Sequence, residues 1–168
     1  DLGWSRAHLV LLHQDVIVYE RKLTKCGIGA VVESLSRELK LHRQRAEALL
    51  METGLSSPAS NVGSEQRQGV SSASETYCRT LVEEMRIPLS YLGNQYPDAL
   101  PETLLIVGSA ATIPGVEKQL DSLLDFHVRT VRPGDVVTCT SDIDERFGPS
   151  IIAAAGLGQF SVRATSEQ

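Results

Sequence analysis

The first 55 residues contain two strand-like hydrophobic patterns followed by two helix-like ones. Two β-rich runs, residues 7–12 and 16–23, flank a short polar break, which predicts an antiparallel hairpin. Apolar residues at helical spacing then predict a helix over residues 28–41 and a second over residues 42–53, which ends at Gly54 as a C-cap. The chain is therefore expected to begin with a hairpin followed by a small helical part.

The middle of the chain has a different composition. Residues 56–74 are rich in Ser and Gly and nearly free of large apolar side chains, so burial cannot offset the entropy of ordering them. We expect a mobile loop there. The pattern of residues 75–96 predicts a long helix, and Pro88 within it predicts a kink or a division into two helices.

The last third predicts alternating strands and helices. The continuous apolar run over residues 103–108 is typical of a strand covered on both faces. A helix over residues 113–126 follows, with Pro114 in its first turn and a buried stripe formed by Val116, Leu120, Leu123 and Leu124. A short strand over residues 127–131 precedes a small-residue helix over residues 148–160, which we expect to pack against a sheet. This order implies an α/β layer with at least one parallel strand pair.

Composition and charge narrow the classes of function. The hydrophobic fraction of 42% and the charged fraction of 22% are ordinary for a soluble globular protein. A formal net charge of −5 argues against a nucleic-acid surface. No apolar run approaches the roughly 20 residues that cross a bilayer, and no signal-peptide pattern is present, so we expect no direct membrane insertion. Three scattered cysteines, Cys26, Cys78 and Cys139, favour buried thiols in a reducing cytoplasm.

The N-terminal stretch Asp1-Leu2-Gly3-Trp4-Ser5 has residues suited to a phosphate. Gly3 would let the backbone approach a phosphate closely, and the Ser5 hydroxyl could donate a hydrogen bond to it. The carboxylate of Asp1 could hold Mg²⁺ through water. An ordinary turn before a strand is the alternative interpretation of this stretch.

A second stretch, "LLIVGSAATIPGV" over residues 104–116, predicts a buried strand, a tight turn of small residues and a helix opened by proline. Such a turn, formed by Gly108, Ser109 and Ala110, would let a flat purine ring lie against the backbone. The N-terminus of the following helix would favour a nearby anion. A purely structural joint between strand and helix is the alternative here.

Taken together and in this order, the two stretches resemble the second lobe of the actin-like ATPase superfamily. Its members share a phosphate-binding D-x-G hairpin and a later strand–Gly-Gly–helix adenosine motif. Within the superfamily the chain is most similar to the PilM family of type IV pilus assembly proteins, and more distantly to the FtsA family of division proteins. The stretches that carry this likeness are "CGIGAVVESLSREL", "QRAEALL", residues 82–133 and "GPSIIAAAGLG".

The resemblance implies an α/β fold, the second lobe of an actin-like (ribonuclease H-like) ATPase, with a mixed sheet that starts at a β-hairpin and is flanked by helices. We expect a hairpin and small helical subdomain over residues 1–55, a flexible loop over 56–74, and a helix–strand–helix–strand–helix part over 75–168. A first lobe would precede Asp1 in a full family member, so the chain is interpreted as a C-terminal half, either cut at the hairpin or naturally truncated.

The resemblance also implies a nucleotide site that comprises Asp1, Gly3, Ser5, Glu47, Gly108, Ser109 and Ala110, with Asp1 holding Mg²⁺ through water. Glu47 matches the glutamate of the family's A-E-x-x-K helix, but Leu50 stands at its lysine position. Ser109 replaces the second glycine of the adenosine turn, and only Gly27 remains of two glycines before the first helix. These departures predict a weakened or vestigial site, unless contacts from the first lobe compensate.

The function that the resemblance implies is that of a cytoplasmic scaffold or adaptor in a type IV pilus or related secretion platform at the inner membrane. Its partner would be a bitopic inner-membrane protein, bound through that protein's cytoplasmic tail. Whether the protein also forms a homo-oligomer is left open by the resemblance. ATP and Mg²⁺ would bind weakly or not at all. The alternatives are an ATPase or phosphotransferase of the same superfamily and an FtsA-like division protein. No catalytic residue is assigned, because ATPase activity would need the first lobe.

Overall fold

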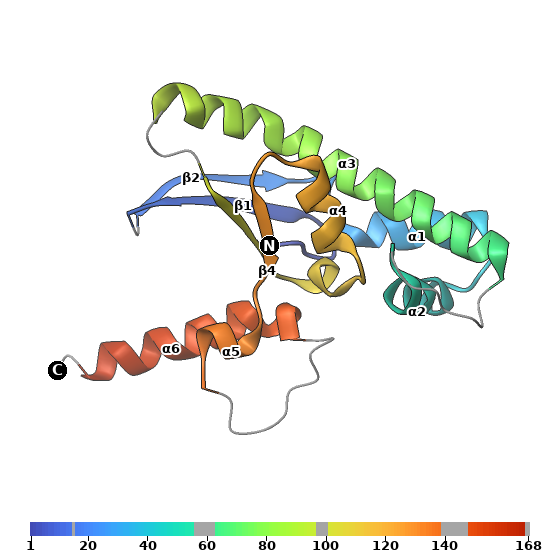
Figure 1. The fold of residues 1–168 in the computed structure, drawn as a ribbon. Helices are drawn as coiled ribbons and strands as arrows, with labels where there is room; N and C mark the ends of the chain where they lie inside the picture. The colour runs from blue at the N-terminus through green and yellow to red at the C-terminus, as the bar shows by residue number, and fades with distance from the viewer. Residues whose placement is uncertain (15, 56–62, 97–100, 139–147, 167–168) are drawn as a thin grey trace.

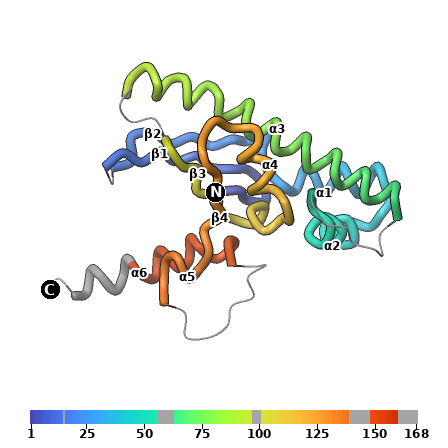
Figure 2. The backbone as a smooth tube through the Cα atoms, in the orientation of Figure 1, coloured from blue at the N-terminus to red at the C-terminus, as the bar shows by residue number. Residues whose placement is uncertain are grey.

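The structure is a computed structural model that describes residues 1–14, 16–55, 63–96, 101–138 and 148–166, with side chains described up to residue 159. Figures 1 and 2 show the path of the chain. Its elements in order are β1 (Ala7–His13), β2 (Val16–Leu23), α1 (Ile28–Glu38), α2 (Arg43–Thr53), α3 (Ser64–Gln95), β3 (Thr103–Ile106), the 3-10 helix η2 (Ser109–Thr112), α4 (Val116–Leu123), β4 (His127–Thr130), α5 (Pro133–Val136), the 3-10 helix η3 (Gly148–Ile151) and α6 (Ile152–Ser166).

The predicted start of the chain is confirmed. β1 and β2 pair antiparallel, with an irregularity in register between Leu11 and Leu12. α1 and α2 follow, and α2 ends at Gly54, whose N–H donates to the carbonyl of Leu50. These elements form where expected because the spacing of their apolar residues matches the faces that they bury.

Helix α3 begins earlier than expected and is longer than the predicted helix. It begins at Ser64, so the loop expected over residues 56–74 is wrong from Ser64 onward, whereas residues 56–62 lie outside the described part. Burial explains this difference, because Val70 and Ser74 are 0% and 2% exposed. The helix is also not divided at Pro88, which lies buried within one continuous helix.

The expected parallel strand pair is confirmed, since β3 and β4 pair parallel. The expected cover on both faces of β3 is wrong, because Leu105 is 52% exposed. The small-residue helix also differs from expectation. α6 contacts α5 and η3, and leaves Leu157 73% exposed. α4 begins at Val116, after the left-handed Gly115, so Pro114 precedes the helix.

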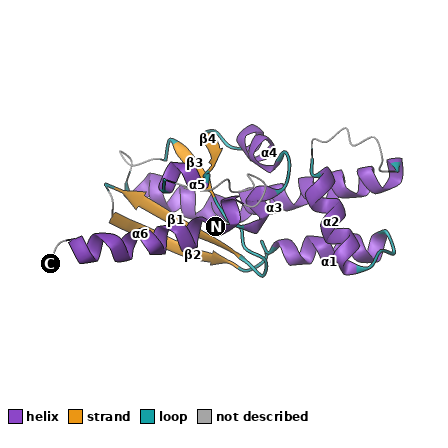
Figure 3. Ribbon diagram, turned by 90° about the horizontal axis from the view of Figure 1, so that it is seen from below, coloured by secondary structure: helices purple, strands orange, loops and turns teal. Residues whose placement is uncertain are grey.

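The two strand pairs are linked through Asp1 and Leu2. Asp1 exchanges two backbone hydrogen bonds with His8 of β1, and the N–H of Leu2 donates to the carbonyl of Val107 after β3. In Figures 1 and 3, α3 runs along one side of the hairpin, and α5 and α6 lie on the opposite side. One continuous core connects the hairpin, α1, α2, α3 and α4; its fully buried members include Val32, Leu35, Leu49, Leu50, Cys78 and Val116. Among the helices of the described residues, none is long and apolar enough to cross a bilayer.

Candidate functional site

The N-terminal turn and the turn after β3 meet at one corner of the molecule. Gly108 has a φ of +94°, a conformation that favours glycine. A Cβ atom at Gly108 would overlap Oδ1 of Asp1 and would lie 2.8 Å from the carbonyl oxygen of Leu2. The exposed carboxylate of Asp1 is therefore held against the backbone of the second motif. The sequence placed these two motifs about a hundred residues apart, and the fold brings them into contact.

Backbone hydrogen bonds fix this corner. The N–H of Leu2 donates to the carbonyl of Val107 at 2.7 Å, and the N–H of Ala110 donates to the carbonyl of Leu2 at 2.9 Å. The hydroxyl of Ser109 also donates to the Leu2 carbonyl, at 3.4 Å. The Ser109 side chain and the Ala110 amide are thus engaged with Leu2, which leaves them less available to a ligand.

The rest of the N-terminal turn packs against the start of α1. The N–H of Ile28 donates to the carbonyl of Gly3 at 3.3 Å, and the N–H of Gly29 donates to the carbonyl of Trp4 at 2.9 Å. Gly27 is required here because a Cβ atom at this position would lie 2.7 Å from the carbonyl oxygen of Trp4. The first amides of α1 therefore bind the turn itself. Ser5 is exposed.

One face of α2 reaches from the first motif to the second. Near its start, the guanidinium of Arg43 lies 5.2 Å from the centre of the Trp4 ring. Near its end, the sulfur of Met51 accepts a hydrogen bond from the Thr112 hydroxyl at 3.5 Å. Glu47 lies midway, four residues from each, so these three residues share one helix face. Glu47 is half-buried on this face, between the residues that make these two contacts.

The residue at the family's lysine position does not face this corner. Leu50 is 0% exposed and belongs to the core. The sequence comparison treated Leu50 as a lost contact to nucleotide, but the structure shows that it packs inside the protein. The burial of Leu50 could have been predicted from helical spacing, because Leu50 lies on the same face of α2 as the buried residues Ala46, Leu49 and Thr53.

The corner offers a carboxylate for a hydrated cation, whereas the Ala110 amide and the Ser109 hydroxyl are already engaged with Leu2. Mg²⁺ prefers carboxylate ligands and retains several waters, which fits one exposed aspartate beside a glycine turn. Among the described residues, no group of three His, Cys, Asp or Glu side chains could hold a metal directly. The nucleotide contacts of Asp1, Gly3, Ser5, Glu47, Gly108, Ser109 and Ala110 stay predictions.

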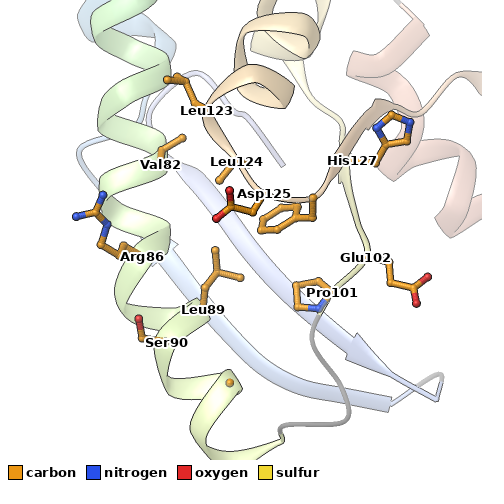
Figure 4. A pocket seen from close by; sticks show the side chains of 12 residues that line it. Val82, Arg86, Leu89, Ser90, Pro101, Glu102, Leu123, Leu124, Asp125 and His127 are labelled. Carbon is orange, nitrogen blue, oxygen red and sulfur yellow. The ribbon is translucent and has the colours of Figure 1, made fainter.

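A cavity of about 1030 Å³ lies elsewhere, between α3 and the segment that connects α4 to β4 (Figure 4). Apolar side chains of Val82, Leu89 and Leu124 share its lining with the charged Arg86 and Asp125. The sequence analysis predicted no cavity here, because these residues come from separate elements that only packing brings together.

The two described cysteines carry no reactive thiol. Burial raises the pKa of Cys26 to about 11, with Glu84 adding to the effect, and burial raises the pKa of Cys78 to about 12. The expectation of buried thiols is therefore confirmed for these two residues, and Cys139 lies outside the described residues.

Solved structures share the fold of this chain, which is the mixed α/β fold that the sequence predicted for the second lobe of an actin-like ATPase. One is a structure described as a PilM–PilN type IV pilus biogenesis complex, with a TM-score of 0.74 and 22% identity over 96% of this chain and 44% of that one. Another is the ethanolamine utilization protein EutJ from Carboxydothermus hydrogenoformans, with a TM-score of 0.60 and 14% identity over 95% of this chain and 47% of that one.

This chain thus spans less than half the length of either structure. No protein-family model and no curated protein sequence matches it. At these identities the likeness establishes the fold, and activity and partners must be argued from the residues.

Proposed function

We propose that this chain is one lobe of an actin-like assembly adaptor, and that it serves a type IV pilus or a related secretion platform. The likeness to the PilM–PilN complex, with the higher of the two TM-scores, supports this choice over the role of EutJ. Under this proposal the protein works in the cytoplasm, at the periphery of the inner membrane. It binds the cytoplasmic tail of a bitopic pilus or secretion protein.

The observation that supports the proposal most is the contact between Asp1 and Gly108, which lie in the two stretches predicted to form a nucleotide site. We propose that Asp1 holds hydrated Mg²⁺ and that ATP binds there weakly. The Ala110 amide and the Ser109 hydroxyl already bind Leu2, so a nucleotide would have to replace those bonds. If a nucleotide takes both donors, the Leu2 carbonyl is left unpaired at a cost of about 1–3 kcal/mol, which moves a micromolar affinity toward the millimolar range.

The competing function is an ATPase or phosphotransferase of the same superfamily, or an FtsA-like division protein. The exposed carboxylate of Asp1 beside a glycine turn favours a protein that handles nucleotides. Titration calorimetry with Mg-ATP on the longest natural form of the protein distinguishes the adaptor from an ATPase or phosphotransferase. We expect a dissociation constant near 1 mM, and turnover no higher than that of the Asp1→Asn variant.

Micromolar binding together with turnover that Asp1→Asn abolishes would overturn the adaptor proposal in favour of an enzyme. Partner binding is measured separately, by fluorescence anisotropy with peptides that cover the cytoplasmic tails of the bitopic proteins encoded nearby. A scrambled peptide of the same composition is the control. An adaptor should distinguish one tail from its scrambled form, and equal binding of both would contradict this role.

A further inference from the structure

Helix α4 covers only part of the length of α3. α3 has 32 residues, whereas α4 has eight and ends at Leu123, where the chain turns away toward β4. The cavity of about 1030 Å³ lies where this cover ends, and we call it the α3 groove (Figure 4). The α3 residues that line it follow one another at helical spacing and so form one face of about three turns: Val82, Arg86, Leu89, Ser90 and Gly93.

The floor of the α3 groove is apolar and rests on the core. Val82 and Leu89 of α3 are half-buried and pack against the core, and so are Leu123 and Leu124 at the end of α4. In Figure 4, the side chains of Val82 and Leu89 extend from α3 toward Leu124 on the other wall. Their remaining surface is removed from water when apolar groups fill the groove, which favours binding. An occupant therefore needs apolar side chains at several positions along α3.

The two walls of the α3 groove carry opposite charges. Arg86 lies on the wall formed by α3, and Asp125 lies on the wall formed by the segment between α4 and β4. Both residues are exposed, and neither forms an ion pair with another residue that the structure describes. The C-terminus of α4 adds partial negative charge on the side of Asp125. One wall thus favours an anionic group and the opposite wall a cationic one.

The shape of the α3 groove favours a helix over a strand or a small molecule. Its only lining residue in a described strand is His127, and β4 already pairs with β3, so the groove offers no open edge to a further strand. Its volume lies at the upper end of the roughly 300–1,000 Å³ of small-molecule pockets. A helix has two flanks beside its apolar stripe, so it can present carboxylates to one wall and ammonium groups to the other.

We propose that the α3 groove binds an amphipathic helix of a partner protein. This helix lies along α3 beyond the end of α4 and inserts a stripe of large apolar side chains between Val82, Leu89 and Leu124. It places carboxylates beside Arg86 and ammonium or guanidinium groups beside Asp125, in the manner of other helices that bind in apolar grooves. This partner is separate from the cytoplasmic tail of the proposed function, so the two interactions stand or fall independently.

Three labelled peptides of about 16 residues test the proposal by fluorescence anisotropy on the longest natural form of the protein. All three carry the same leucine stripe at helical spacing. The first has glutamates on one flank and lysines on the other, the second has lysines on both flanks, and the third has glutamates on both. We expect the first peptide to bind with a dissociation constant below about 100 μM, and about fivefold more tightly than either of the others.

Reversing the charge of one wall should change which peptide is preferred. Arg86→Glu makes both walls acidic, so we expect the lysine-flanked peptide to become the tightest of the three. Asp125→Lys makes both walls basic, and the glutamate-flanked peptide should then bind most tightly. Lys118→Glu on α4 and Glu33→Lys on α1 are the matched controls, because they change the net charge equally at exposed positions outside the groove. Both controls should keep the preference for the first peptide.

Three results would overturn the proposal. The first is wild-type protein that binds the three peptides equally, or binds none of them with a dissociation constant below about 1 mM. The second is a change of preference in the controls equal to that in Arg86→Glu and Asp125→Lys, because overall charge would then explain the binding. The third is self-association of the wild type, seen by light scattering, that Arg86→Glu abolishes, because a second copy would then fill the groove.

Discussion

Leu50 shows how one residue can look like a lost functional contact and yet serve the core. Its place in α2 corresponds to a lysine in the family pattern. It is nevertheless 0% exposed, one turn before the C-cap at Gly54. The neighbouring Glu47 occupies the helix face that carries Arg43 and Met51, which contact Trp4 and Thr112. At the scale of single residues, the helix position thus decides between packing and ligand binding.

Replacing Leu50 with lysine should therefore destabilise the protein without improving nucleotide binding. A buried, unpaired ammonium group costs several kcal/mol, so we expect the free energy of unfolding to fall by about 3–5 kcal/mol. The control is Glu47→Lys, which places the same charge on a half-buried face of the same helix. Urea unfolding measures both variants. An equal, small loss in the two would show that Leu50 is not enclosed as described.

At the scale of elements, α4 covers the outer edge of β4 with two carboxylates. The Asp121 carboxylate accepts the N–H of Val128 at 2.9 Å and lies 3.1 Å from Nδ1 of His127. One turn earlier, the Glu117 carboxylate accepts the N–H of Thr130 at 2.9 Å. These side chains bind amides that would otherwise form an open strand edge, which is how the short β4 persists with a single partner strand.

Asp121→Asn should weaken this link in a manner that depends on pH. The bond from the Val128 N–H, and after it the His127 side chain, lower the pKa of Asp121 below its ordinary value of 3.8. The ionised group therefore stabilises the fold above about pH 3.8, and this contribution is lost as the pH falls below that value. Thermal unfolding should show a midpoint a few degrees lower than that of the wild type at pH 7.

The difference in unfolding midpoint between Asp121→Asn and the wild type should shrink as the pH falls below about 3.8. Asp125→Asn removes a charge nearby and leaves the bond to Val128 intact, so it serves as the control. A gap between Asp121→Asn and the wild type that stays constant from pH 7 to pH 3 would contradict the assigned role of the carboxylate.

At the scale of the whole molecule, the contact between Asp1 and Gly108 holds the two strand pairs together. Asp1 bonds to His8 of β1 on one side, and Leu2 bonds to Val107 and Ala110 after β3 on the other. The closeness of this approach requires a residue without a side chain at Gly108. The same contact forms the corner to which the proposed nucleotide site belongs, so the structural joint and the candidate site coincide.

Gly108→Ala should therefore disturb the joint and the site together. The methyl group would overlap Asp1, and the positive φ is strained for alanine, so we expect a loss of about 1–3 kcal/mol and a midpoint lower by roughly 2–10 °C. Gly63→Ala is the matched control, because Gly63 has a negative φ of −57° and nothing within 4 Å of the added atom. Equal midpoints for the two variants would show that the corner is not closely packed.

Local patterns were sufficient for the hairpin, for α1 and α2, and for the parallel pair of β3 and β4, because each depends on the spacing of apolar residues within a short segment. The first turns of α3 could not be predicted in this way. Their composition is that of a loop, and they are helical because Val70 and Ser74 are buried in the folded chain.

The sequence by itself thus determined most of the element types and the two motifs, because these depend on residues that lie close together in the chain. The contact between Asp1 and Gly108 and the burial of Leu50 arise only when distant segments pack. Such contacts depend on long-range geometry, in which the position of each element is set by all the others. The periodicity of apolar residues predicts which face of an element is buried, but it does not predict which other element covers that face.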